Sequence, residues 1–305
     1  MSLGERLTVG EARDLCRSVR TALANGASAL MLDGGQLVAT DIVGLAAIVQ
    51  SHRLALAAGI RCAVIPSAQL VRDVIRARAA DELTLLDVPR LRAAPARRRR
   101  AMPGGTVIAC AGRVILRQPT SSDAVHFHRW AQDPLVEQMV GSDLLYLHRH
   151  LRPGDSALVN SLVHDPRALT ALVEPAGEPH RPRGFVRLYD VDLVSGFGFV
   201  ETVVAQARST SRGLGIEAAR LLLAFAQDAL QLRRIEAKAY AYNVLSVNAL
   251  RRNGFKQEGV LRKARVYDGE AWDIFVFSIL EPEMAVERVR DTFPDFSLFR
   301  EEVPA

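Results

Sequence analysis

The stretch STSRGLGIEAAR, residues 209–220, places two glycines one residue apart, directly before a long apolar run. Gly213 and Gly215 have no Cβ atom, so another group can approach the backbone closely, and the N–H groups at a helix start attract anions. The apolar run predicts a helix from about Gly213 to Leu232. The stretch therefore predicts a phosphate-binding turn at a helix N-terminus. A glycine-rich turn with ordinary helix capping is the alternative.

The length of the chain, 305 residues, suggests two domains. We expect the first over residues 1–92 and the second over residues 105–282, followed by a tail over residues 283–305. Residues 93–104 between them are rich in arginine, alanine and proline, which is typical of a linker.

The linker carries a run of four positive charges, Arg97, Arg98, Arg99 and Arg100, in a chain of net charge +5. Such a run is either solvated or attached to an anionic group. No cluster of aromatic side chains that would stack on RNA bases accompanies it, so we do not expect a nucleic-acid partner.

Composition excludes several classes of protein. The chain is 49% hydrophobic, yet no run approaches the roughly eighteen apolar residues of a membrane span. The N-terminus lacks the apolar core of a signal peptide, so we expect a cytoplasmic protein without a membrane span. Cys16, Cys62 and Cys110 have no metal-type spacing, which favours reduced buried thiols and predicts no metal site.

Helices and strands alternate in the first domain, which favours a parallel sheet. Glycines and a proline bound the segments, and Ser67 is a candidate N-cap. The expected elements are helices at 9–26, 42–59 and 67–80 and strands at 28–34 and 61–66.

The stretch ALMLDGGQLVATDIVGLAAIV carries a resemblance to STAS domains, the fold of anti-sigma-factor antagonists and MlaB-like proteins. Asp41, Gly44 and Leu45 match the family's loop, while Ile42 and Val43 replace its hydroxyl residues. Neither replacement has a side-chain oxygen, which excludes phosphorylation at those two positions. The resemblance covers about residues 7–86 and implies a STAS-like sheet with helices that serves regulation, docking or dimerisation.

The second domain reads as an α/β domain with a mixed, mainly antiparallel sheet. Turn-rich segments separate its strand candidates, which indicates a meander, and Asp268 with Gly269 predicts a closing hairpin. The expected strands include 168–175, 184–192, 196–204 and 234–240, with helices at 213–232 and 243–254.

Two motifs in this domain resemble those of the GNAT acetyltransferases, in particular the RimJ/RimL-like branch. The first is the opening stretch, where Gly213 and Gly215 match and Thr210 replaces the family's arginine or glutamine. The second combines NVLS at residues 243–246 with RRNGF at residues 251–255. The resemblance covers about residues 113–281. It implies an N-acetyltransferase that uses acetyl-CoA as its co-substrate.

The resemblance also implies roles for individual residues. Glu201 is the candidate general base, and Ser246 is the candidate acid, because Leu250 stands where many members have tyrosine. Tyr267 and Asp273 are weaker candidates for contact with the acceptor. The candidates for binding acetyl-CoA are Val203, Val204, Arg208, Arg212, Gly213, Leu214, Gly215, Asn243 and Ser246.

Structural alternatives stand beside these roles. Glu201 fits an ordinary solvent-facing strand carboxylate, and Asn243 and Ser246 fit helix caps.

The function expected from the residues is acetyl transfer to a primary amine, which is a protein α-amino group, an amino sugar or another small amine. We expect residues 142–165 and the last hairpin to set specificity. The alternative is a weakly active or inactive CoA-binding scaffold, which the departures at Thr210 and Leu250 permit. A protein partner for the first domain, self-association and the role of the tail are left open.

Overall fold

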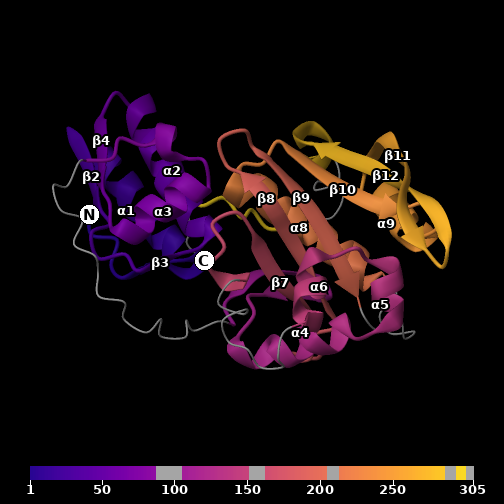
Figure 1. Cartoon of the computed structure of the whole chain (residues 1–305). Coiled ribbons are helices and arrows are strands. Elements are labelled where there is room, and N and C mark those ends of the chain that lie inside the picture. Colours follow the sequence, from indigo (N-terminus) through magenta and orange to yellow (C-terminus); the bar gives the residue numbers. More distant parts are fainter. Residues whose placement is uncertain (87–104, 151–161, 205–212, 286–292, 300–305) are drawn as a thin grey trace.

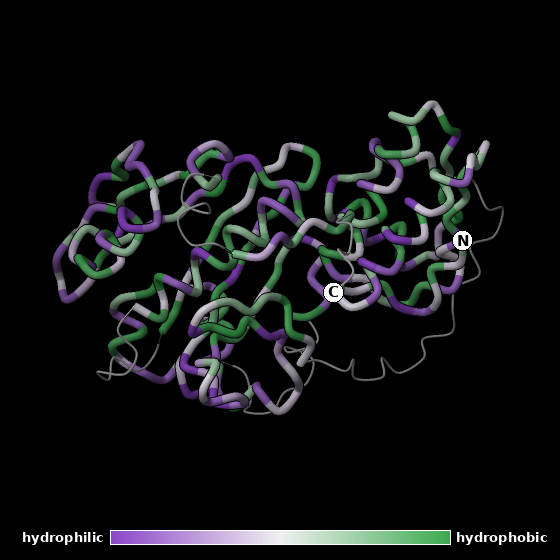
Figure 2. The backbone as a smooth tube through the Cα atoms, turned by 180° about the vertical axis from the view of Figure 1, so that it is seen from behind, coloured by the Kyte–Doolittle hydropathy of each residue, from purple (hydrophilic) through white to green (hydrophobic). Residues whose placement is uncertain are grey.

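The computed structural model describes residues 1–86, 105–150, 162–204, 213–285 and 293–299. They form two parts that lie side by side when viewed from opposite directions (Figures 1 and 2). The first part contains β1 (Arg6–Leu7), α1 (Val9–Ala24), β2 (Ala29–Asp33), β3 (Ala39–Thr40), α2 (Ile42–Ala57), β4 (Arg61–Ile65), α3 (Ala68–Arg76) and η1 (Ala80–Glu82). The linker arginines Arg97, Arg98, Arg99 and Arg100 lie outside the described residues.

The strands of the first part pair in parallel, as the alternation of helices and strands predicted. β1 pairs with β3, and β2 pairs with β4 over five residues. The helix and strand predictions for residues 9–80 are confirmed within a few residues at each end, and Ser67 caps α3 by accepting from Leu70 N at 3.1 Å.

Helix α2 is buried along most of its length. Its sequence is apolar nearly all round, which is typical of a helix with neighbours on every side. It packs on α1, on β4 and on α8 of the second part. Gln50 Nε2 donates to the carbonyl oxygen of Ala229 in α8 at 2.8 Å. α2 therefore joins the two parts.

The second part is built on one eight-stranded sheet of order β11-β12-β10-β9-β8-β7-β6-β5. Every neighbouring pair is antiparallel except β9 with β10, which confirms a mixed, mainly antiparallel sheet. The strands are β5 (Val107–Ala111), β6 (Val114–Arg117), β7 (Leu169–Pro175), β8 (Gly184–Asp192), β9 (Phe197–Val204), β10 (Arg234–Tyr240), β11 (Lys256–Tyr267) and β12 (Glu270–Leu280). The predicted hairpin at Asp268 and Gly269 joins the last two.

Helices cover both faces of this sheet. They are η2 (Ser121–Asp123), α4 (Ala124–Ala131), α5 (Pro134–Met139), α6 (Asp143–His150), α8 (Leu214–Leu230) and α9 (Val244–Arg252). Neighbouring residues of β8 show the two layers: Phe185 packs in a cluster with Phe127 and Trp130 of α4, whereas Val186 belongs to the core that includes α8. Figure 1 shows α4 and α6 in front of the strands and α8 behind them.

The described part of the tail packs between the two parts. Phe296 is buried, contacts Phe225 of α8, and donates its N–H to Asp228 Oδ2 at 2.8 Å. Arg20 of α1 donates to the carbonyl oxygen of Phe299 at 2.6 Å. Residues 293–299 therefore tie α8 to α1.

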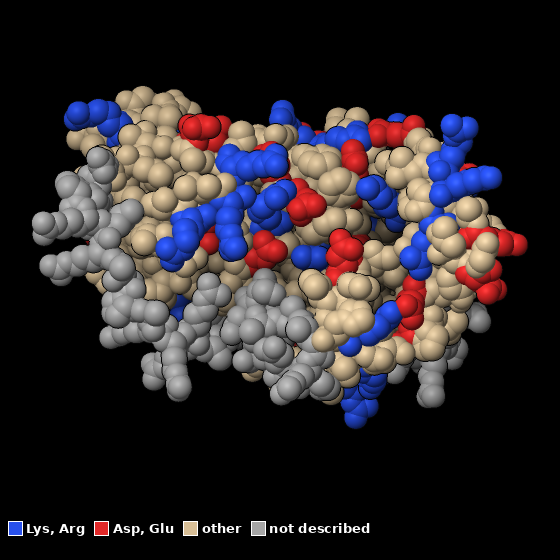
Figure 3. Space-filling view, in the orientation of Figure 1, with Lys and Arg blue, Asp and Glu red and all other residues tan. Residues whose placement is uncertain are grey.

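Charged side chains of both signs share the face shown in Figure 3. Ion pairs among the described residues include Arg167 with Asp190 and Arg53 with Glu82. In the described part of the chain, no helix combines the length and the apolar character that a membrane crossing requires.

Candidate active site

The large sheet opens between β9 and β10. These parallel strands pair only at residues 197–199 with 234–236, so the following residues of each strand have no register partner on the other. The edge of β9 from Val200 to Val204 therefore faces a gap in the sheet, at the end where the glycine turn leads into α8. Backbone N–H groups on such an edge are free to meet a ligand.

The glycine turn lies at one end of this gap. Gly213 is the N-cap of α8, has a φ of 84°, and supplies no side-chain cap. A Cβ atom on Gly215 would lie 2.9 Å from Val204 Cγ2, so the glycine permits the first turn of α8 to pack on β9. Leu214 is buried in the core and anchors the same turn. Helix geometry and missing Cβ atoms thus suit an anion at this end.

Two of the predicted cationic contacts, Arg208 and Arg212, lie outside the described residues. The structure brings another arginine to the turn: Arg113 Nη2 lies 3.5 Å from the position of a Cβ on Gly213. Arg113 also forms an ion pair with Glu217 in the first turn of α8. No local motif in the sequence marks this residue, because it reaches the turn from the distant β5–β6 hairpin.

The two predicted valines of β9 lie in different environments. Val203 is buried in the cluster under α4–α6, and Val204 is half-buried beside Gly215. Both side chains pack against other apolar groups. If either residue binds acetyl-CoA, it does so through its backbone N–H, and this role stays a prediction.

Glu201 has the features of a buried base. It lies opposite Arg187 of β8, and its side chain is 14% exposed. Arg187 Nη1 is 3.6 Å from Glu201 Oε1, and within the described residues this oxygen has no hydrogen-bond partner. Burial raises the pKa of Glu201, although Arg187 and a hydrogen bond from Ser142 oppose that shift. A carboxylate with a raised pKa binds a proton from an ammonium group more readily.

Asn243 is engaged in the fold. Its side-chain oxygen caps α9 by accepting from Ser246 N at 3.0 Å, and its amide donates to the carbonyl oxygen of Met139 at 2.9 Å. Asn243 thus caps α9, the structural role that was predicted as the alternative to a ligand contact. Ser246 is half-buried in the first turn of α9, and its hydroxyl takes part in no hydrogen bond with another described residue, so it can act as a donor. The catalytic and binding roles of both residues stay predictions.

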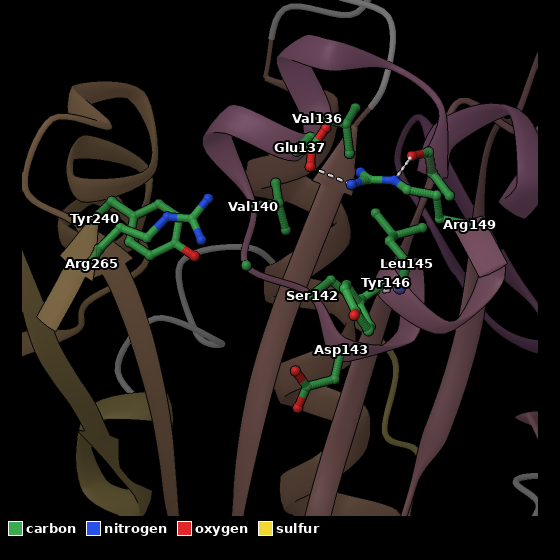
Figure 4. Close-up of a pocket in the computed structure, with 12 residues that line it drawn as sticks. Val136, Glu137, Val140, Ser142, Asp143, Leu145, Tyr146, Arg149, Tyr240 and Arg265 are labelled. Carbon is green, nitrogen blue, oxygen red and sulfur yellow. Dashed lines mark hydrogen bonds and ion pairs between the residues drawn. The ribbon is translucent and has the colours of Figure 1, made fainter. Parts of the chain in front are cut away.

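A cavity of about 260 Å³ lies beside the gap, between the α5–α6 region and the strands β10 and β11. Figure 4 shows Ser142 and Asp143 on the helical side and Tyr240 with Arg265 on the strand side. Arg149 and Glu137 form an ion pair in its wall. The lining residues are Ala131, Val136, Glu137, Val140, Gly141, Ser142, Asp143, Leu145, Tyr146, Arg149, Tyr240 and Arg265.

The two weaker acceptor candidates lie near this cavity without lining it. Tyr267 packs against Tyr242 in a tilted arrangement, with ring centroids 5.6 Å apart. Asp273 Oδ1 accepts from the backbone N–H of Lys263 at 2.8 Å, so it holds strand β11. Among the described residues, no group of three histidine, cysteine, aspartate or glutamate side chains has an arrangement that could hold a metal ion.

Comparison with known proteins decides the family of this part. Residues 113–256 match the profile of the acetyltransferase (GNAT) domain. The chain contains a GNAT acetyltransferase domain. The match confirms the prediction of a GNAT-type N-acetyltransferase. It covers α8, the glycine turn and the motif of α9, and it ends at Lys256, the first residue of β11.

Curated relatives of the GNAT domain carry N-acetyltransferase names. An N-acetyltransferase 9-like protein from Caenorhabditis briggsae is 27% identical over 140 residues, which are 43% of this chain and 68% of that protein. An uncharacterized N-acetyltransferase p20 from Bacillus licheniformis is 35% identical over 74 residues, 24% of this chain. The chain spans only 42% of the length of the second relative.

The solved structures to which this chain is similar include RimJ from Mycobacterium smegmatis in complex with CoA-disulfide. It is 25% identical, with a TM-score of 0.47, and the alignment covers 62% of this chain and 94% of that one.

Proposed function

We propose that the chain transfers the acetyl group of acetyl-CoA to a primary amine. The observation that carries the proposal is the opening between β9 and β10. It has the glycine turn of α8 at one side and, beside it, a Glu201 oxygen that has no hydrogen-bond partner among the described residues. The family profile supports an acetyl-CoA-dependent acetylation. A protein α-amino group, an amino sugar and another small amine all fit the term primary amine.

Different groups of the chain would perform the binding, polarisation and proton-transfer steps of the reaction. The N-terminus of α8, with Arg113 beside it, would hold the pyrophosphate of acetyl-CoA, and N–H groups at the edge of β9 would polarise the thioester carbonyl. Glu201 would take the proton from the acceptor ammonium, so that the neutral amine forms the C–N bond as the C–S bond breaks. The Ser246 hydroxyl would donate a proton to the leaving sulfur and would be reprotonated by the second proton that the nitrogen loses as the amide forms.

For the first part of the chain, we propose a STAS-like module that braces α8. Its parallel strands and three helices support the comparison. Asp41 to Leu45, the loop that carries the resemblance, is buried where α2 meets its neighbours. A module buried at this loop is suited to holding the acetyltransferase domain in place.

The test of the proposed function measures thiol release from acetyl-CoA with a panel of primary amines. We expect turnover by the parent chain, and a loss of about a hundredfold or more in kcat/KM for Glu201→Gln, with acetyl-CoA still bound in calorimetry. Thermal melting of the variant checks that the loss is not unfolding. A parent chain that binds acetyl-CoA but acetylates no amine would favour the scaffold alternative, and unchanged turnover in Glu201→Gln would remove that residue from the mechanism.

A further inference from the structure

The cavity beside the gap has two ends of opposite charge. Asp143 lies at the start of α6 on one side, and Arg265 lies on β11 at the other (Figure 4). The other charged pair in the wall, Glu137 with Arg149, is already neutralised internally. Among the described residues, Arg265 takes part in no ion pair, and its Nε is buried without a hydrogen-bond partner. The cavity thus offers one carboxylate and one guanidinium to a ligand.

An irregularity in β11 puts Arg265 in this place. The register of β11 against β12 runs from Leu261 opposite Ile274 to Arg265 opposite Trp272, so β11 carries two extra residues between them. Lys263 at the bulge has a φ of 50°, and Asp273 holds its backbone N–H. Bulges of this kind re-aim side chains next to functional sites. Without the extra residues, Lys263 would lie opposite Trp272.

Aromatic side chains fix the orientation of Arg265. Its guanidinium carbon lies 4.9 Å from the centroid of the Tyr240 ring. Tyr240 stacks on Tyr242 with centroids 5.3 Å apart, and Tyr242 packs edge-on against Trp272. A guanidinium that is stacked on a ring and held in plane is well prepared for a bidentate contact with an anion.

Tyr240 also joins the two ends of the cavity. Its hydroxyl lies 1.9 Å from the position that a Cβ on Gly141 would occupy, so only glycine permits this contact. Ser142 follows directly and lines the cavity, and its side chain lowers the pKa of Glu201. The cavity therefore extends from Arg265, past Tyr240, to Ser142 and Asp143, whose side chains both act on the pKa of the proposed base, Glu201.

The opposite end is acidic. Glu201 and Asp143 are close enough for the charge of Asp143 to act on Glu201, and Arg187 is the nearby cation, 3.6 Å from Glu201 Oε1. Arg187 also lies 3.9 Å from Asp165, so three carboxylates lie near one guanidinium and leave a negative excess that favours an ammonium group.

We propose that the acceptor amine carries a second group, an anionic carboxylate or phosphate, which Arg265 binds while Asp143 and Glu201 hold the ammonium. This inference rests on the proposed acetyl transfer and specifies its substrate class. A diamine would place its second ammonium against Arg265 and be repelled, whereas an alkylamine would gain nothing there. The anionic group gains charge-assisted hydrogen bonds that discriminate it from both.

The test uses acceptors that differ only in the group distant from the amine: n-alkylamines, α,ω-diamines, ω-aminocarboxylates and ω-aminoalkylphosphonates of three to six carbons. For the parent chain we expect kcat/KM to be highest for an anionic acceptor and lowest for a diamine. Comparison of the carboxylates with the phosphonates tells which anion Arg265 takes. Diamines acetylated as well as the anionic acceptors would overturn the proposal.

Variants of one residue sharpen the result. In Arg265→Gln we expect kcat/KM to fall about tenfold to a hundredfold for the anionic acceptors and little for alkylamines. Arg265→Glu should shift the preference toward diamines. Arg262→Gln is the matched control, because Arg262 is exposed on the same strand and does not line the cavity. An equal fall for every acceptor in Arg265→Gln would contradict a role in specificity.

Calorimetry with acetyl-CoA separates this proposal from the one on which it rests. A chain that binds acetyl-CoA and acetylates alkylamines or diamines but no anionic acceptor keeps the proposed function and loses the substrate class. A chain that binds no acetyl-CoA loses both.

Discussion

Two helix starts, those of α2 and α8, contrast sharply. At the start of α2, Asp41 supplies a side-chain cap, and its two oxygens accept from Gly44 N, Val9 N and Gln118 Nε2 at 2.9–3.1 Å. At the start of α8, Gly213 supplies no side chain, and the turn borders the gap in the sheet. The first start is satisfied by the protein itself, whereas the described residues give the second no side-chain cap, which suits an anion.

Glycine serves both starts for different reasons. Gly44 lies against the backbone of Leu7, whereas Gly215 lies against a side-chain methyl of Val204. Backbone cannot move without disturbing its strand, but a side chain can rotate. Both glycines therefore permit close packing, and the atoms beside each one decide how costly an added Cβ would be.

The largest effect should come from closing the space at the first start. In Gly44→Ala, the new Cβ would lie 2.1 Å from the carbonyl oxygen of Leu7, so β1 and α2 would have to separate. We expect the free energy of unfolding to fall by about 3 kcal/mol or more, as measured by urea denaturation. Gly10→Ala is the matched control, because it adds a methyl group to α1 in open space and should stabilise by about 0.5–1 kcal/mol. Equal stability of Gly44→Ala and the parent would contradict this packing.

A second effect should appear in the pH dependence of stability. Burial raises the pKa of Asp41 to about 6, above the value of about 3.9 for an unfolded chain. The folded state then binds this proton more tightly, so the stability contributed by Asp41 is highest below pH 4 and falls as the pH rises from about 4 to about 6. The change amounts to about 3 kcal/mol.

Asp41→Asn isolates this contribution, because it keeps the shape and removes the titration. We expect the parent to gain stability relative to Asp41→Asn when the pH is lowered from 7 to 5, as followed by denaturation at each pH. Parallel pH profiles for the two proteins would show that Asp41 does not titrate in this range.

A smaller effect is expected at the second start. In Gly215→Ala, the Cβ would meet Val204 Cγ2 at 2.9 Å, a contact that rotation of the valine relieves in part. We expect affinity for acetyl-CoA to fall about tenfold, with a melting temperature close to that of the parent. A loss of stability as large as that of Gly44→Ala would show that the neighbours of Gly215 yield no more easily than the backbone beside Gly44.

The smallest effect should come from Ser142→Ala. The Ser142 hydroxyl lowers the pKa of Glu201, against the larger effect of burial, which raises it. Without the hydroxyl the pKa rises, so the acidic limb of the pH profile of kcat/KM should move to higher pH while the plateau at high pH is kept. A shift in the opposite direction, or none, would indicate that Glu201 is not the base that the profile reports.

The sequence predicted what depends on local spacing. Alternating apolar residues and turn residues located β7 to β12, and the two glycines with their apolar run located α8. The positions of Gly213, Leu214 and Gly215 at the helix start follow from the same local pattern.

Residues whose role depends on register or on distant contacts were not predicted. Arg265 reaches the cavity only through the bulge at Lys263, and Arg187 meets Glu201 only because β8 and β9 pair in one register. Arg113 lies beside Gly213 in the fold, although about a hundred residues separate the two in the sequence. At Asn243 the sequence marked the position but not the role. A helix cap and a ligand contact both call for an asparagine there, so the sequence alone does not separate them.

The most direct test of the account is calorimetric titration of acetyl-CoA into the parent, Gly213→Asn and Gly213→Asp. Both side chains enter a left-handed conformation that asparagine and aspartate tolerate best among non-glycine residues, so the two variants share the backbone strain and differ in charge. We predict micromolar binding by the parent, weakened binding by Gly213→Asn, and no detectable binding by Gly213→Asp. Equal affinities of the Asn and Asp variants, or no binding by the folded parent, would contradict an anion site at the start of α8.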